Sequence, residues 1–178
     1  MARYFVDTDV LIFWFQQKAF GQNDCQHHEN SVQWLEECEK NKDEIFIPAL
    51  AYAEFCAVDI LEYEKRLELI DELAWKTVAY DQRHAGLSGK IWGEMQKHQK
   101  MPKKNDKTVL KFDICIAATA AIHNADALIT CNTKHFIGDS PQGIQSALLR
   151  LGYGLPMREP VPLQARLKGT AFAPTKKK

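Results

Sequence analysis

The chain has 178 residues, a length typical of one domain, which buries roughly 70% of its open surface on folding. Its residues are 46% hydrophobic and 26% charged, close to the globular average, which argues against disordered, collagen-like and coiled-coil proteins. Basic and acidic residues both number 23, so the formal net charge is zero, which argues against a chain that is basic throughout for nucleic-acid binding.

Short apolar runs alternate with longer helical patterns along the chain. Runs rich in β-branched and aromatic residues predict strands at 4–6, 45–47, 77–80 and 127–130. Helical patterns lie at 10–15, 31–40, 49–73 with a break near 63, 83–100 and 112–123. Polar loops are expected at 21–30 and 101–108. This alternation indicates an α/β fold with a parallel sheet and right-handed crossovers, in which ligands bind beyond the carboxyl ends of the strands.

The last part of the chain carries a weaker pattern. We expect a helix at 141–151, an edge strand at 160–163 and a frayed tail at 173–178. The organisation predicted from these segments is one domain at 1–140 and a C-terminal extension at 141–178 that packs on it.

Charge is distributed unevenly. Residues 34–82 contain 13 acidic and five basic side chains, whereas 97–111 contain six lysines and one aspartate. Residues 140–178 contain seven basic side chains and one acidic one. The second half of the chain therefore has the charge to meet a polyanion, despite the neutral total.

The cysteines and the start of the chain bear on its location. Five cysteines with no CxxC spacing fit neither a zinc ribbon nor a disulfide framework. Asp7 and Asp9 interrupt the first apolar run before it reaches the length of a signal sequence, and the longest weakly polar run, 114–122, is about half a membrane span. We expect a cytoplasmic protein without membrane association.

Polar side chains follow the predicted strands at one edge of the sheet. Asp7 comes after the first strand and Asn132 after the fourth, while Glu54 and Asp113 lie near the starts of two predicted helices. Clustered carboxylates repel one another when ionised, and a hard divalent cation with oxygen ligands removes that cost. The four positions together predict metal-dependent phosphodiester hydrolysis. Each residue singly also has a structural interpretation: Asp7 and Thr8 as helix caps, Glu54 facing solvent, and Asp113 as a partner of its helix dipole.

Four segments resemble the successive motifs of the PIN domain family, in particular the VapC-type toxins of toxin–antitoxin pairs. The third and fourth are the most specific, with an Asp ahead of an Ile-Ala-Ala helix and a strand that ends in Thr and closes on Phe. The segments are Val6–Ile12, Ile47–Phe55, Asp113–Ala120 and Leu128–Phe136.

The resemblance implies a three-layer α/β/α fold with a central parallel sheet, and cleavage of RNA with Mg²⁺ or Mn²⁺. Asp7, Glu54 and Asp113 would be the acidic metal-site residues. Asn132 stands where family members often have Asp; Asp9, two residues from Asp7, can restore the charge. Thr130 and Asn132 would orient the attacking water or the phosphate, and Thr8 and Asp9 would support them.

A lysine-rich stretch runs up to Asp113. It is either a solvated loop or a strip of phosphate contacts that supplies affinity without sequence information. The candidate contacts are Lys103, Lys104, Lys107 and Lys111.

Three functions stay open at this point. The first is an endoribonuclease toxin, homodimeric and held inactive by a small antitoxin protein. The second is a PIN-like RNA-binding or regulatory module with weak or no catalysis. The third is a housekeeping RNA-processing nuclease without an antitoxin.

Overall fold

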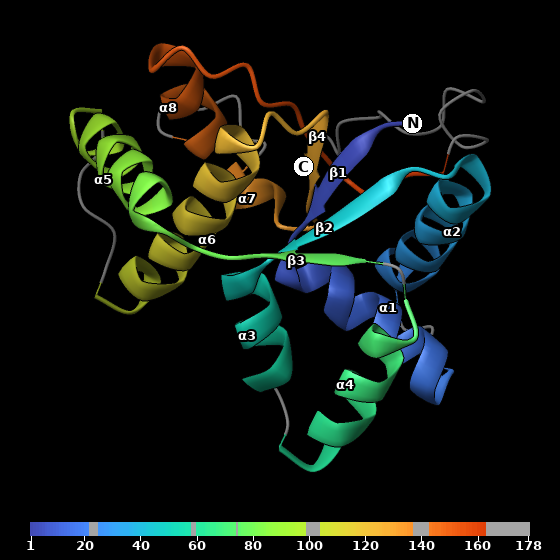
Figure 1. The fold of residues 1–178 in the computed structure, drawn as a ribbon. Helices are drawn as coiled ribbons and strands as arrows, with labels where there is room; N and C mark the ends of the chain where they lie inside the picture. The colour runs from blue at the N-terminus through green and yellow to red at the C-terminus, as the bar shows by residue number, and fades with distance from the viewer. Residues whose placement is uncertain (22–24, 58–59, 74, 99–103, 137–142, 163–178) are drawn as a thin grey trace, which may run out of the picture.

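Five parallel strands form the central sheet, in the order β3-β2-β1-β4-β5 (Figure 1). The computed structural model describes residues 1–21, 25–57, 60–73, 75–98, 104–136 and 143–162, without the side chains of 60 and 104–107. The strands are β1 Arg3–Val6, β2 Glu44–Pro48, β3 Lys76–Val78, β4 Ala127–Ile129 and β5 Met157–Arg158. Phe5 of the central strand pairs with Phe46 on one side and Leu128 on the other.

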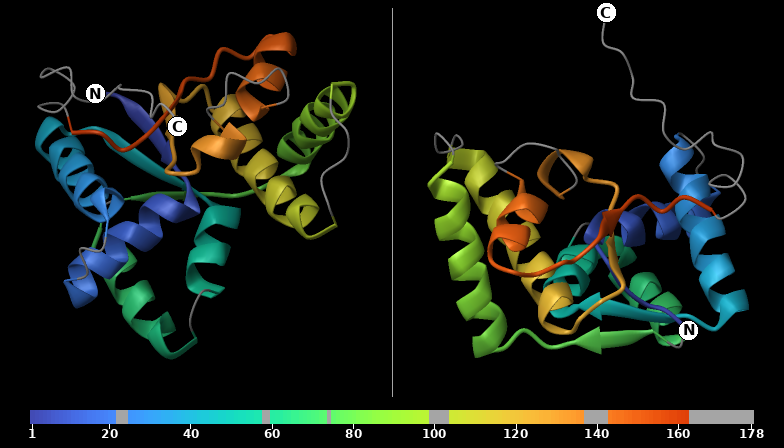
Figure 2. Two further views of the ribbon diagram at one scale, coloured as in Figure 1. Left: turned by 180° about the vertical axis from the view of Figure 1, so that it is seen from behind. Right: turned by 90° about the horizontal axis from the view of Figure 1, so that it is seen from above.

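Helices cover both faces of this sheet, which gives the three layers predicted from the sequence (Figures 1 and 2). One group packs together on one face: α1 Thr8–Phe20, α2 Gln26–Asn41, α3 Ala49–Ala57 and α4 Tyr63–Asp71, with the 3₁₀ turn η1 Ile60–Glu62. The other group is α5 Gln82–Gln96, α6 Lys104–Ile122, α7 Thr133–Phe136 and α8 Ile144–Arg150. The buried strands read as continuous apolar runs because both of their faces are covered.

Local signals explain where several elements begin and end. Asp7 caps α1 by accepting a hydrogen bond from the Thr8 amide, and Gly21 ends this helix in the left-handed region, at a φ of 64°. Asp81 and His84 form a reciprocal capping box at the start of α5. The long pattern over 49–73 breaks before Tyr63, as predicted, into α3 and α4.

Two predicted loops are partly helical. α2 begins at Gln26 and α6 at Lys104, inside segments predicted as loops. At the start of α2 the buried residues are polar, His28 and Ser31, so a search for apolar periodicity misses this turn. The edge strand is Met157–Arg158 rather than 160–163.

The C-terminal segment contributes to the same architecture. α8 packs on α5, and β5 pairs with β4, so that Leu128 lies opposite Met157. Ile144, Ala147 and Leu148 are fully buried. The tail expected at 173–178 lies outside the described residues. Within the described segments, no helix is both long and apolar enough to cross a membrane.

Candidate active site

The site lies where the chain reverses its direction across the sheet. From β1 the chain moves to β2 and β3 on one side, and it later returns to β4 and β5 on the other. The crossover helices therefore diverge beyond the carboxyl ends of β1 and β4, which is where open parallel sheets bind ligands. Asp7 follows β1 directly, and its amide donates to the Ile129 carbonyl of β4 at 2.9 Å.

Asp7 is held by groups from the two segments that directly follow the central strands β1 and β4. Its side chain is 3% exposed, with Oδ1 accepting from the Thr8 amide at 2.8 Å and Oδ2 from the Thr130 hydroxyl at 2.7 Å. Thr130 is entirely buried, and its Oγ1 also accepts from the backbone N–H of Asn132 at 3.0 Å. Thr130 therefore fixes the position of Asp7. Capping is one part of the arrangement at Asp7 rather than a competing explanation.

Glu54 joins the site from the second turn of α3. The Thr8 hydroxyl donates to its Oε2 at 2.7 Å, so the residue after Asp7 orients a second carboxylate. Arg66 anchors the end of the same helix from α4. Its Nη1 donates to the Phe55 carbonyl at 2.6 Å and its Nη2 pairs with Glu62 at 2.8 Å. This cation is 1% exposed, so the segment that follows Glu54 is tied to the core.

Asp113 reaches the site from the opposite face, on α6. Its Oδ2 accepts from Nδ2 of the Asn132 side chain at 3.3 Å and contacts His135 Nδ1 at 2.6 Å. Because an ionised carboxylate only accepts hydrogen bonds, the imidazole donates from Nδ1. His135 was not among the site residues predicted from the sequence. Its spacing of three residues from Asn132, one helical turn, was the signal available.

These carboxylates line one cavity of about 380 Å³, together with Thr8, Asp9, Asn132 and the apolar side chains Ile12, Ala57 and Val109. We call it the acidic cavity. Burial, and then the charges of Asp113 and Asp9, raise the pKa of Asp7 well above its ordinary value of 3.8, against the hydrogen bonds from Thr130 and Thr8.

The pKa values of Asp9 and Glu54 are raised as well. For Asp9 the causes are burial and the charge of Asp113, partly offset by His27 and His135. For Glu54 burial dominates, and the Thr8 hydrogen bond opposes it. Like charges thus share a poorly solvated space.

The chain matches the PIN domain family over residues 4–137. It belongs to this family. PIN domains are generally nucleases, hydrolases that act on nucleic acid, and the match spans every residue that lines the acidic cavity. No curated protein sequence matches the chain.

Solved structures similar to this PIN domain include toxin–antitoxin complexes. VapBC2 from Rickettsia felis, bound to a DNA fragment from its promoter, is 17% identical with a TM-score of 0.57, over 88% of this chain and 98% of that one. DNA-bound VapBC from Salmonella typhimurium is 17% identical with a TM-score of 0.56, over 90% and 99%. FitAcB from Neisseria gonorrhoeae is 20% identical with a TM-score of 0.55, over 88% and 97%. At these identities the likeness shows the fold.

The donors in the PIN domain's cavity fit a hard divalent cation. Within the described residues, no three His, Cys, Asp or Glu side chains already converge as a complete metal site. Mg²⁺ and similar ions need only one or two carboxylates and take water for the rest of their shell. Asp7 and Asp113 would supply those carboxylates, and their mutual repulsion is the cost that a bound cation would remove.

Of the four lysines predicted to contact nucleic acid, only the side chain of Lys111 belongs to the part of the chain that the structure describes, and it does not line this cavity. Lys111 Nζ lies 5.7 Å from the centre of the Trp92 ring, on the side of α6 that faces α5, and does not line the cavity. Lys103 and the side chains of Lys104 and Lys107 fall outside the described part of the structure. Their contact with nucleic acid stays a prediction.

Proposed function

We propose that this PIN domain is a metal-dependent endoribonuclease and the toxin of a toxin–antitoxin pair. The observation that carries the proposal is the convergence of Asp7, Glu54 and Asp113, from three different elements, on one cavity at the switch point of the sheet. Burial and then the neighbouring negative charges raise the pKa of Asp7 and Glu54, and a divalent cation would relieve the repulsion between these carboxylates.

Asp7 and Asp113 would hold Mg²⁺ or Mn²⁺, with Glu54 binding directly or through water. Such an ion supplies a nucleophile at neutral pH and neutralises charge on the phosphate. The chain's own residues orient this arrangement: Thr130 fixes Asp7, Thr8 fixes Glu54, and His135 and Asn132 fix Asp113. Asn132 and Asp9 also line the cavity, where they can contact the water or the phosphate.

Two observations support the toxin assignment. The VapBC and FitAB complexes each contain a chain with the same fold as this protein. The match covers between 94% and 99% of that chain. The acidic cavity also has an apolar rim, where Val109 is 51% exposed beside Ile12 and Ala57. Carboxylates bordered by exposed apolar side chains suit a small antitoxin with a basic residue among apolar ones. The toxin would act in the cytoplasm as a homodimer.

Cleavage of RNA by the purified full-length chain tests the nuclease. We expect cutting with Mg²⁺ or Mn²⁺, none with chelator, and none by D113N, since Asn keeps the shape and removes the charge. D71N, at an exposed aspartate on α4, is the matched control and should cut like the wild type. Cutting in chelator would contradict metal dependence, and equal activity of D113N would remove Asp113 from the site. Cleavage of DNA alone would overturn the RNA assignment.

Expression in a bacterial host tests the toxin assignment. We expect growth arrest that D113N does not cause and that a neighbouring reading frame relieves. Metal-dependent cleavage without arrest would favour a housekeeping nuclease. Binding of RNA without cleavage would favour a regulatory module. Sedimentation of the purified chain measures whether it is a dimer.

A further inference from the structure

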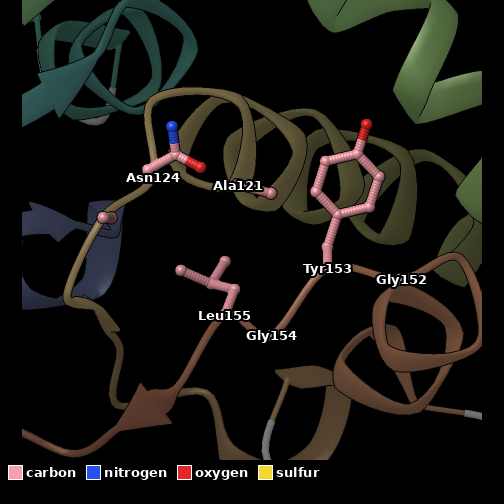
Figure 3. Close-up of a pocket in the computed structure, with 7 residues that line it drawn as sticks. Ala121, Asn124, Gly152, Tyr153, Gly154 and Leu155 are labelled. Carbon is pink, nitrogen blue, oxygen red and sulfur yellow. The ribbon is translucent and has the colours of Figure 1, made fainter.

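A second hollow lies at the other end of α6 from the acidic cavity. Its inner part, about 240 Å³, is enclosed by the last turn of α6, Asn124 and the segment 152–155 (Figure 3). Its outer part, about 380 Å³, continues along α5 to Arg83, Gly86 and Lys90. The two parts share Ala121, Asn124 and Tyr153, so we treat them as one surface, the α5 groove.

The floor of the α5 groove is low because it carries glycine where no backbone requirement explains it. Gly86 sits inside α5, where glycine costs about 1 kcal/mol relative to alanine. Its φ is not positive, and a Cβ built there would meet nothing within 4 Å. Gly154 on the facing segment has the same properties, whereas Gly152 is required by its φ of 85°. Gly89 and Gly93 of α5 are equally unconstrained, but of the three only Gly86 lines the groove, where its missing side chain keeps the floor low.

The rim of the α5 groove carries positive charge. Arg83 and Lys90, two turns apart on α5, are both exposed and line the outer part. Arg83 pairs with Asp81 at 3.1 Å, and Lys90 forms no ion pair with a described residue. Further along α5, Glu94 pairs with Lys97 at 2.7 Å and with Arg150 of α8 at 2.9 Å. Asp81 and Glu94 thus pair with Arg83, Lys97 and Arg150, and Lys90 adds an exposed positive charge at the rim.

The junction of the two parts of the groove offers an aromatic ring and an amide. Tyr153 and Asn124 lie on either side of Ala121, from the two segments that enclose the hollow (Figure 3). A ring stacks on a base of any sequence, and an amide donates to and accepts from base edges. Cations at one end and a ring with an amide at the other match the phosphate and the base of one nucleotide.

We propose that the α5 groove binds a nucleotide of single-stranded RNA outside the acidic cavity, with its base on Tyr153 and its phosphate at Lys90 and Arg83. This inference rests on the proposed function, because it assigns a second contact to the same substrate. Asp113 and Ala121 are eight residues apart on α6, about 12 Å along the helix axis, which a short strand can span. A second contact of this kind adds affinity and fixes the register of the strand before cleavage.

Alanine at two glycines of α5 provides a matched test. G86A places a methyl group on the groove floor, and G89A places one in open space outside both parts of the groove. Both variants should raise the melting temperature by about 2–4 °C, because alanine favours the helix. Only G86A should weaken RNA binding, by at least about fivefold in Kd, because the methyl group overpacks the bound strand. Greater stability together with weaker binding distinguishes a ligand site from damage to the fold.

Binding is measured by fluorescence anisotropy with a labelled 12-nucleotide single-stranded RNA, in Mg²⁺, on the full chain carrying D113N so that it stays uncut. R83Q/K90Q on this background should reduce the slope of log Kd against log salt by about 0.7, since the two side chains contact one phosphate and each neutralised phosphate on a single strand contributes about 0.7. K40Q/K42Q, at two exposed lysines around the end of α2, is the control pair and should leave the slope unchanged. Y153A should weaken binding at least about fivefold and Y153F should not, because phenylalanine retains the stacking ring.

The inference is overturned if G86A binds RNA as tightly as G89A, or if R83Q/K90Q behaves like K40Q/K42Q. It is also overturned if these substitutions change only self-association, which would make the groove a contact between copies of the chain. If the wild type cuts RNA while the groove variants bind normally, the proposed function survives and the second site does not. If the groove variants lose binding while the wild type cuts nothing, the site survives and the nuclease does not.

Discussion

The two sides of the acidic cavity hold their carboxylates through different kinds of groups. On one side Asp7 follows the central strand of the sheet, and Thr130, a fully buried residue directly after β4, holds it. On the other side Asp113 lies on a helix, held by Asn132 and by His135 from the four-residue helix α7. A helix-capping backbone amide and a buried hydroxyl fix the first carboxylate, whereas side chains alone orient the second. The comparison predicts that substitutions on the first side change stability together with activity, and those on the second mainly change activity.

The largest effect is expected from D7N. It should lower RNA cleavage more than about 100-fold. Loss of a group that only hydrogen-bonds to a metal ligand costs about 10–100-fold, and loss of the ligand itself should cost more. It should also raise the melting temperature of the metal-free protein at pH 8, because burial raises the pKa of this carboxyl and makes its charge unfavourable. Calorimetry in chelator and a cleavage assay measure both, with D71N as the control. Loss of activity with lower stability would contradict the electrostatic explanation.

T130V is expected to lower both properties. Valine matches threonine in shape but leaves Asp7 Oδ2 and the backbone N–H of Asn132 without the hydroxyl that both of them contact. Leaving a buried polar group unpaired costs about 1–3 kcal/mol in the free energy of unfolding. T130S retains the hydroxyl and should remain close to the wild type. Chemical denaturation gives the comparison, and equal stability of the two variants would show that the hydroxyl is not needed.

On the other side of the cavity, replacement of His135 separates positioning from packing. Asn places a nitrogen at the δ position, where it can still donate to Asp113, whereas Gln places its nitrogen one atom further out. H135Q should lower cleavage and Mn²⁺ affinity about tenfold, within the range for groups that orient a metal ligand. H135N should retain most of both, and the stability of each variant should change little. Paramagnetic titration of Mn²⁺ measures affinity independently of cleavage, and equal losses in the two variants would exclude a positioning role.

The smallest effect is the pH dependence of stability without metal. A carboxyl with a raised folded-state pKa binds protons more readily in the folded chain, so stability falls as pH rises above its ordinary value of 3.8 and through the raised pKa. One proton accounts for at most about 1.4 kcal/mol per pH unit. The decline should be smaller in D7N, and Mg²⁺ should stabilise the wild type more at higher pH, since ligands must deprotonate to bind. Melting curves from pH 4 to 8 with and without Mg²⁺ test the sign; stability that rises with pH in chelator would contradict it.

The parts of the fold that were predictable are those with a local cause. Four strands were recognised because runs such as Tyr4–Val6 are buried on both faces and carry β-branched or aromatic residues. The starts of α2 and α6 were missed because helices that begin with polar residues have no apolar period to detect. The position predicted for the edge strand was wrong, because the two-residue strand β5 is defined by its pairing with β4, which no local pattern encodes.

The sequence by itself determined which acids stand at the ends of strands, and the family motifs that connect them. Only the tertiary structure decided which groups orient each carboxylate. Thr130 is 123 residues from Asp7, and Glu54 is 46 residues from Thr8, so these contacts exist only after the sheet has formed. The same holds for the α5 groove, where Arg83 and Tyr153 meet through the packing of α5 against the end of α6. Spacing in the chain limits short-range chemistry, whereas hydrogen bonds between distant residues depend on topology, because the sheet order sets which ends lie side by side.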